Sequence, residues 1–144
     1  FLYPLSRMHS LLLCLSVLST LLALSSAKMQ NVTVKGQTVC HDKAFLDCVI
    51  ELFDHDTFNP NDLLATTTPN AKENAAFYLE GGEDEMGSIE PMICFTHSCD
   101  LPEDKKGCKR QACHDIPEEY IDGPIYDMTF VSLNIMYKDE KIIC

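Results

Sequence analysis

The stretch CFTHSCDLPEDKKGCKRQAC, residues 94–113, decides the fold because its four cysteines are arranged as mirror images. If the two halves pair as an antiparallel hairpin, one register places Cys99 opposite Cys108 and Cys94 opposite Cys113. Residues directly opposed in such a ladder have Cα atoms about 4.5–5.5 Å apart, near the separation that a disulfide spans. The spacing therefore predicts two disulfides across one hairpin, in an oxidised β-protein.

Alternation along the two strands assigns these bridges to opposite faces of the hairpin. Cys99 falls on the same face as the apolar residues, so the Cys99–Cys108 bridge is expected on the buried side. Cys94 and Cys113 are expected on the outer side. Both assignments require that no β-bulge interrupts residues 94–99.

An apolar segment near the N-terminus predicts the compartment. From Met8 it reads MHSLLLCLSVLSTLLALSSA, and the small residues Ser25 and Ala27 occupy positions that signal peptidase prefers. We expect cleavage after Ala27, which removes a signal peptide with Cys14 and the upstream residues 1–7. The alternative is a membrane anchor, but a spanning helix needs roughly 20 predominantly apolar residues, and this stretch is shorter and interrupted by Ser and Thr. The sequence predicts a secreted, extracellular protein.

The expected mature chain, residues 28–144, has the size of one domain and a strong negative charge. The full chain carries a formal net charge of −11, and the leader removes only the positive Arg7, so the mature charge becomes −12. A charge of this sign disfavours nucleic acid as a partner, and also a polybasic attraction to anionic lipid. Most of the acidic residues are expected in solvated loops, while basic or cation-bridged partners remain open.

Short apolar segments separated by Gly, Pro, Asn and Asp predict an all-β domain. Antiparallel pairing into a β-sandwich of about seven to eight strands fits this pattern. In the last segment, alternation places every second residue from Thr129 to Tyr137 on one face. The expected strands are residues 32–40, 48–53, 63–68, 76–80, 92–99, 109–116 and 125–137.

Several motifs in sequence order resemble the nematode transthyretin-like family. They run from VTVKGQTVC at residues 32–40 through VIELFDHD, NPNDLLA, FYLEGG, HSC, CKR and IPEEYI, ending at residue 121. A final strand before Cys144 completes the resemblance, which spans nearly all of the mature chain. It implies a disulfide-stapled, transthyretin-like (prealbumin-type) sandwich and an extracellular role.

The resemblance also implies a disulfide pattern. It implies Cys99 bonded to Cys108, and Cys40 in the first strand bonded to Cys144. With Cys94–Cys113, this pattern leaves Cys48 unpaired and available for a disulfide-linked dimer. An alternative is Cys40–Cys48, which leaves Cys144 for an intermolecular bond.

The chain departs from the family at a turn. The family usually has a glycine before the aromatic residue in the stretch TTTPNAKENAAFYL, where this chain has Ala75 and Ala76. Because alanine does not easily adopt φ > 0, a loop of different shape is expected.

Histidine placement argues against an enzyme. The related hydroxyisourate hydrolases use His and Arg with a Y-R-G-S end, whereas this chain ends in KIIC. In the hairpin register His97 faces Arg110 and His114 faces Ile93, so the two histidines do not form a close pair. His41 and His55 are expected in loops. We therefore predict no catalytic residues and no cofactor.

Two smaller signals concern modification and metal binding. Asn31-Val32-Thr33 is a glycosylation sequon close to the expected cleavage point. Asp54, Asp56 and Asp62, together with Asn61, form an oxygen-rich loop that is a weak calcium candidate. The loop lacks the glycine and terminal glutamate of a calcium-binding loop, so turn capping is the favoured role.

These features together predict a secreted, non-catalytic binding or adaptor protein. The expected contact surfaces are the loops at residues 54–62 and 81–90. The expected partner is an extracellular protein or a cell-surface ligand, and the mature chain is not expected to span a membrane. The alternatives are a carrier of a small hydrophobic ligand, and a host-directed effector or protease inhibitor.

Overall fold

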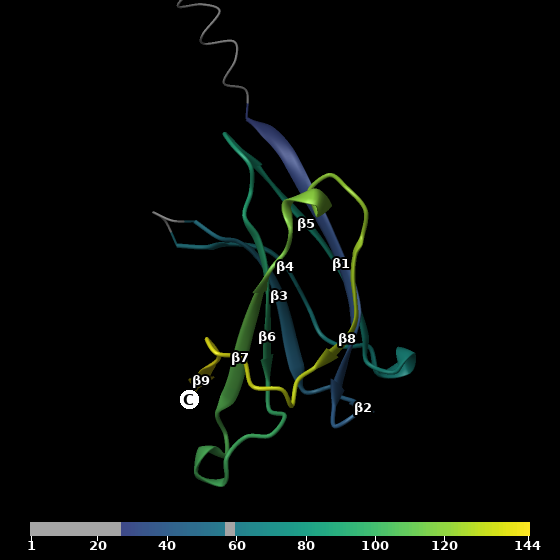
Figure 1. Ribbon diagram of the computed structural model, residues 1–144, viewed down its shortest axis with the longest axis vertical. Coiled ribbons are helices and arrows are strands. Elements are labelled where there is room, and N and C mark those ends of the chain that lie inside the picture. Colours follow the sequence, from purple (N-terminus) through teal and green to yellow (C-terminus); the bar gives the residue numbers. More distant parts are fainter. Residues whose placement is uncertain (1–26, 57–59) are drawn as a thin grey trace, which may run out of the picture.

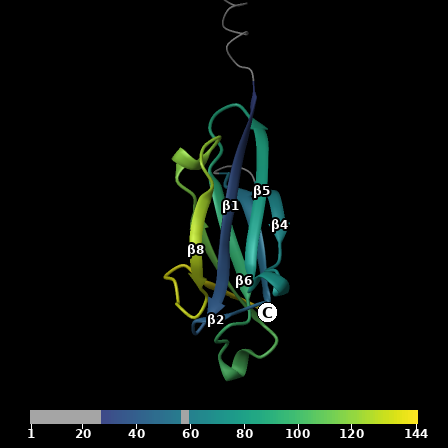
Figure 2. The same ribbon diagram turned by 90° about the vertical axis from the view of Figure 1, so that its right-hand side faces the viewer.

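A computed structural model describes residues 27–56 and 60–144 as a two-layered β-sandwich (Figures 1 and 2). One sheet has the order β2-β1-β5, with β8 also paired to β1; the other has the order β4-β3-β6-β7-β9. The described residues thus form nine strands, rather than seven to eight, because β2 and β9 are short additions. The strands are β1 (Lys28–Cys40), β2 (Lys43–Ala44), β3 (Cys48–Asp54), β4 (Asp62–Thr67), β5 (Ala76–Glu85), β6 (Pro91–His97), β7 (Lys109–Asp115), β8 (Tyr126–Ser132) and β9 (Lys141–Ile143).

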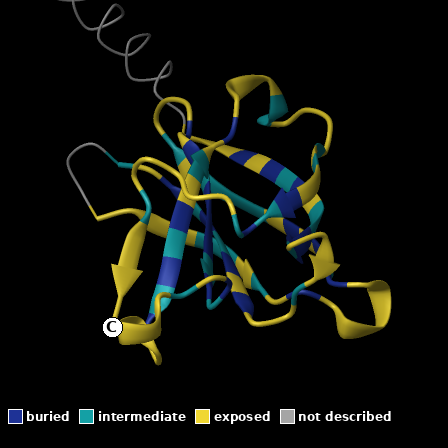
Figure 3. Ribbon diagram, turned by 60° about the horizontal axis from the view of Figure 1, so that its bottom comes forward, coloured by how far each residue is buried: buried dark blue, intermediate teal, exposed yellow. Residues whose placement is uncertain are grey.

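The core lies between the sheets and follows from strand alternation. In β3 every second residue is buried, and the same alternation covers residues 30–34 of β1 and 77–79 of β5. Figure 3 shows buried and exposed residues along the strands. Val34, Ile50 and Phe95 are fully buried, and the Phe77 and Phe95 rings meet edge to face with centroids 5.7 Å apart. Burial of such side chains contributes about 1.5–3 kcal/mol each to folding.

The β6–β7 hairpin has the register that the mirrored cysteines predict. Cys94 lies opposite Cys113, and the two form a disulfide. Further along the ladder His97 lies opposite Arg110, as expected. The hairpin itself is therefore confirmed, together with one of its two predicted bridges.

The predicted Cys99–Cys108 bridge is wrong, because the ladder ends before it reaches these residues. His97 and Arg110 form the last pair, and the chain then leaves β6 for a loop in which Asp100 has φ 52°. Cys99 instead bonds to Cys40 at the end of β1, which joins the two sheets.

The implied Cys40–Cys144 bridge is also wrong, because the C-terminus pairs with the opposite sheet. In the antiparallel β7–β9 ladder Lys109 lies opposite Ile143, and one further step in that register brings Cys108 to Cys144. These two residues are bonded. The alternative Cys40–Cys48 bridge is likewise absent, and Cys48 is a free, buried thiol.

The last predicted strand is shorter and differently paired than expected. β8 runs parallel to β1, and the register shifts opposite Lys35 and Gln37. Thr129 has φ 56° there and is exposed, whereas Val131 and Leu133 are buried. Because β8 ends at Ser132, residues beyond Leu133 do not continue the alternation.

The loop expected at residues 81–90 begins later, because β5 continues through Gly81-Gly82 and pairs with β1 as far as Glu85. Glycine is needed there for close approach, since a Cβ on Gly82 would lie 2.3 Å from the Gln30 carbonyl oxygen. Ala75, at the expected departure from the family, does adopt φ 62°. Its N–H donates to the Asn70 carbonyl at 2.9 Å, and its carbonyl accepts from Thr38 N–H at 3.1 Å. These bonds offset a left-handed strain of about 1–2 kcal/mol.

The predicted signal peptide, with Cys14, lies outside the described residues except for Ala27. In the described ranges, no helix is long and apolar enough to cross a membrane.

Candidate binding groove at the acidic end

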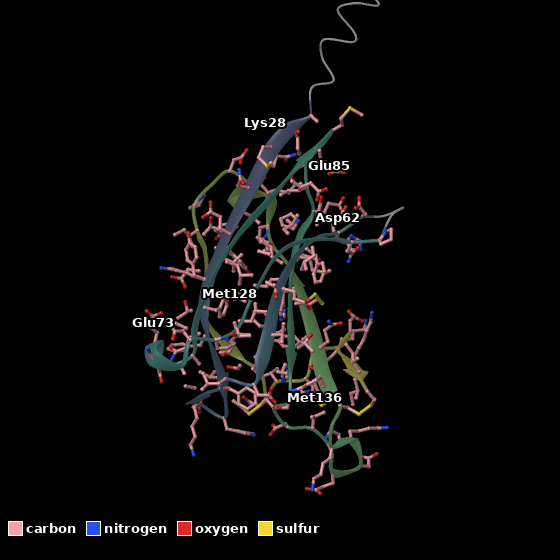
Figure 4. The ribbon with its side chains drawn as sticks, turned by 180° about the vertical axis from the view of Figure 1, so that it is seen from behind. Lys28, Asp62, Glu73, Glu85, Met128 and Met136 are labelled. Carbon is pink, nitrogen blue, oxygen red and sulfur yellow. A yellow bond between two sulfur atoms is a disulfide. The ribbon has the colours of Figure 1, made fainter. Side chains whose placement is uncertain are left out.

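The two ends of the sandwich differ in chemistry. We call the end where β1 begins and β3, β5 and β7 finish the acidic end; Figure 4 shows Lys28, Asp62 and Glu85 there. The opposite end carries the Cys40–Cys99 and Cys108–Cys144 bridges and is called the disulfide end. Acidic side chains of the acidic end are Asp54, Asp56, Asp62, Glu83, Asp84, Glu85, Glu90, Asp115, Glu118, Glu119 and Asp122.

Positive charge is scarce at the acidic end. Lys28 is there, and its ammonium pairs with Asp122 at 2.9 Å. The other lysines and the arginine of residues 28–144 lie along β1 or toward the disulfide end: Lys35, Lys43, Lys72, Lys105, Lys106, Lys109, Arg110, Lys138 and Lys141. The charge of the domain is therefore distributed unevenly along its long axis.

A surface groove of about 500 Å³ opens at the acidic end. Three segments form it: the end of β3, the start of β6, and the chain from the end of β7 into the short 3-10 helix η3 (Glu118–Tyr120). Its lining residues are His55, Ile89, Glu90, Pro91, Met92, Asp115, Ile116 and Glu118.

Backbone hydrogen bonds hold the three segments together. Glu90 N–H donates to the Asp54 carboxylate at 2.6 Å, and its carbonyl accepts from His55 N–H at 3.0 Å. Ile116 N–H donates to the Pro91 carbonyl at 2.8 Å. Asp54 is nearly fully buried, so its carboxylate positions the loop before β6 and does not form part of the open surface.

The floor and rim of the groove differ in polarity. The half-buried Met92 supplies accessible apolar surface, and Ile89, Pro91 and Ile116 are buried in the floor. Glu90 and Glu118 are exposed at the rim. His55 Nδ1 lies 3.4 Å from a Glu90 carboxylate oxygen. An apolar floor beneath charged groups is the usual composition of a site that binds an amphipathic ligand.

Burial and mutual repulsion raise the pKa of two carboxylates at the acidic end. Burial, followed by the charges of Asp62 and Asp54, raises the pKa of Glu83. Burial, followed by the charges of Asp54 and Asp56, raises the pKa of Glu85. A positive ligand would relieve this repulsion.

The calcium candidates Asp54, Asp56 and Asp62 do not come together as one ligand set. Among the described residues, the group of three with metal-ligand spacing is Cys40, Cys99 and Asp100, whose two sulfurs are already a disulfide. Asp54 accepts the Glu90 N–H, a turn-capping contact.

The histidines are separated by position and environment. His41 pairs with Asp100 at 2.7 Å, at the disulfide end. His97 is buried beside Arg110, and burial followed by the Arg110 charge lowers its pKa to about 4. The His114 ring meets the Tyr137 ring edge to face, with centroids 4.6 Å apart, and burial lowers the pKa of His114. As the register predicts, His114 faces Ile93 and His97 faces Arg110.

The sequon residue Asn31 lies exposed on β1, and its backbone N–H donates to Asp122 at 3.0 Å. Glycosylation there stays a prediction. The spare thiol of Cys48 is only 3% exposed, and burial raises its pKa to about 12. A buried, protonated thiol is poorly suited to link two chains.

Two of the three segments that line the groove come from the loops expected as contact surfaces, and the third does not. The ends of the loops at residues 54–62 and 81–90 meet where His55 joins Glu90. Asp115 and Glu118 on the third side were not among the expected contact residues. The predicted β6–β7 register was an available signal for Asp115, because it places this residue opposite Met92.

Comparison with known proteins agrees with the resemblance. A family model described as "TTR-52: Transthyretin-like family" matches residues 35–117. Transthyretin-like protein 16 of Caenorhabditis elegans is 39% identical over 137 residues, which cover 95% of this chain and 99% of that protein. The chain belongs to the transthyretin-like family.

Other members of the transthyretin-like family match over similar lengths. Transthyretin-like protein 33 of Caenorhabditis elegans is 30% identical over 94% of this chain and 97% of its own length. Transthyretin-like protein 5 of the same organism is 31% identical over 93% and 96%. A 9R-lipoxygenase from Cyanothece aligns with a TM-score of 0.48 and 14% identity over 92% of this chain and 21% of its own, which is too weak to bear on fold or function.

Proposed function

We propose that this member of the transthyretin-like family is a secreted, non-catalytic extracellular binding protein that contacts its partner through the acidic end. The observation that carries the proposal is the division of the molecule. Disulfides tie the sheets and the C-terminus together at one end, and an open groove lies at the other. Rigid scaffolds that present binding surfaces on loops commonly have this organisation.

Three further observations support an extracellular role. Three disulfides in a single domain are typical of oxidising compartments. The segment before Lys28 has the pattern of a signal peptide. The buried His97 lies opposite Arg110 and His114 lies opposite Ile93, so the two histidines are not paired across the ladder, which agrees with a binding role.

The proposal is tested by expressing the full chain in insect cells. We expect the protein in the medium, beginning at Lys28, and we expect the purified protein to bind intact cells saturably by flow cytometry. Retention inside the cell, or absence of saturable binding, would contradict the proposal. Native mass spectrometry of the same protein distinguishes a carrier, which would retain a small-molecule adduct.

A matched pair of substitutions locates the contact surface. Met92→Trp fills the groove without changing charge, and Met136→Trp places the same side chain near the disulfide end, where Met136 is exposed (Figure 4). We expect Met92→Trp alone to weaken cell binding. Equal binding by both variants would show that the contact surface lies outside the groove. The comparison requires that both variants unfold at the same temperature as the parent protein.

A further inference from the structure

The groove at the acidic end has a chemistry that selects its ligand. Its floor is formed by Met92 and the buried Ile89, Pro91 and Ile116, and its rim carries carboxylates from two segments: Glu90 before β6, and Asp115 and Glu118 on the chain from β7 into η3. A ligand that satisfies both must place apolar atoms on the floor and positive charge at the rim.

Two of the rim carboxylates are not engaged in ion pairs. Glu90 is held by His55, whereas among the ion pairs of residues 27–56 and 60–144 none involves Asp115 or Glu118. Both side chains are exposed, so a ligand can reach them without a change in the fold. The excess negative charge of the whole acidic end adds a longer-range attraction.

We propose that the groove binds a lysine or arginine side chain within a basic, partly aliphatic segment of an extracellular partner protein. This inference rests on the proposed function and specifies its partner class. The aliphatic stem of the basic residue lies on the apolar floor, as such stems do along apolar surfaces. Its charged head reaches Asp115 and Glu118, where charge-assisted hydrogen bonds form.

The volume of the groove fits a side chain. About 500 Å³ accommodates one long side chain and the backbone around it. An acidic or a purely polar segment would leave the floor unfilled and add repulsion at the rim. The proposed specificity therefore needs both the charge and the stem.

The test uses the disulfide-bonded protein purified from medium and a fluorescent, capped hexapeptide of sequence Gly-Leu-Lys-Arg-Leu-Gly. Fluorescence anisotropy measures its affinity, with Gly-Leu-Glu-Glu-Leu-Gly as the opposite-charge probe. We expect saturable binding of the basic peptide alone, which weakens as ionic strength rises.

Two double variants with the same loss of charge decide where the peptide binds. Asp115→Asn with Glu118→Gln neutralises the groove rim, and we expect affinity to fall about tenfold. Glu103→Gln with Asp104→Asn neutralises the 3-10 helix at Glu103–Lys105, near the disulfide end, and we expect affinity within about twofold of the parent. These side chains are exposed, so both variants should fold.

Each other outcome overturns the proposal. Equal weakening by the two variants would mean that the peptide senses only net charge. Absence of saturable peptide binding would remove the proposed partner class. If the same protein still binds cells saturably, the proposed function stands and only this inference fails.

Discussion

Arg110 and Glu140 form a buried ion pair that fastens the C-terminal segment to the start of β7. Their side chains are 2% and 4% exposed, and Arg110 Nη2 donates to Glu140 Oε2 at 2.9 Å. Arg110 also donates to the Cys99 carbonyl at 2.9 Å. Although burial acts to raise the pKa of Glu140, the Arg110 hydrogen bonds and charge hold it below its usual value. One guanidinium thus links the β6 loop, β7 and the segment before β9.

Loss of the Arg110 charge should destabilise the domain strongly. Arg110→Met leaves the Glu140 carboxylate buried and unpaired, so the free energy of unfolding should fall by about 3–5 kcal/mol in urea titrations. Adding Glu140→Leu should restore a large part of this loss. As a control, Lys106→Met removes an exposed pair with Glu103 and should cost less than about 1 kcal/mol. Similar losses for the two single variants would contradict this role.

Acid should destabilise the protein through His97. Its pKa is lowered from 6.5 to about 4, so between these values the unfolded chain binds the proton that the folded protein excludes. Stability is therefore full above pH 6.5 and falls as the pH drops toward 4, by on the order of 3 kcal/mol in total. Chemical denaturation at several pH values measures this fall.

The His97→Asn variant is the matched control for that pH dependence. In the parent protein the Cys99 N–H donates to His97 Nδ1 at 3.2 Å. The side-chain oxygen of asparagine can accept the same hydrogen bond, but asparagine does not titrate. We expect a shallower loss of stability in this variant, with the remainder from His114, whose pKa burial also lowers. A parent protein equally stable at pH 6.5 and pH 5 would show that His97 protonates freely.

Disulfide mapping should distinguish the observed pairs from those that the sequence predicted. Proteolysis without reduction, followed by mass spectrometry, should yield peptides joined through Cys40–Cys99, Cys94–Cys113 and Cys108–Cys144. Peptides joined through Cys99 and Cys108 would refute the connection between the two sheets.

Cys48 should resist alkylation in the folded protein. Its thiol is buried and its pKa is raised to about 12, so iodoacetamide should label it only after addition of denaturant, without reduction. The non-reduced protein should consequently migrate as a monomer. Rapid labelling under native conditions would show that β3, which carries Cys48, opens. A dimer that is abolished both by reduction and by Cys48→Ser would show the same.

A methyl group at Gly82 should separate β1 from β5. A Cβ there would lie 2.3 Å from the Gln30 backbone oxygen, which cannot move without breaking the ladder. Gly82→Ala should lower the free energy of unfolding by about 2–3 kcal/mol. Glu80→Ala, at an exposed position of the same strand, should change it by less than about 0.5 kcal/mol. Equal stability of the two variants would indicate that the strands tolerate the added volume.

Local pattern determined the β-sandwich class, the β6–β7 register and the Cys94–Cys113 bridge. These follow from strand alternation and from spacing within one hairpin, where neighbours in space are neighbours in sequence. The loops that contribute to the groove were also accessible, because charge and turn residues mark them.

Tertiary structure alone decided the partners of Cys99 and Cys108, the parallel pairing of β8, and the position of Glu118 at the rim of the groove. Cys40 reaches Cys99 because the two sheets pack face to face. The two cysteines are 59 residues apart in the sequence, so no local spacing encodes their pairing. Likewise, no local pattern pairs Arg110 with Glu140, because 30 residues separate them. Packing of the C-terminal segment against β7 removes both from water, and their mutual charge then stabilises the arrangement.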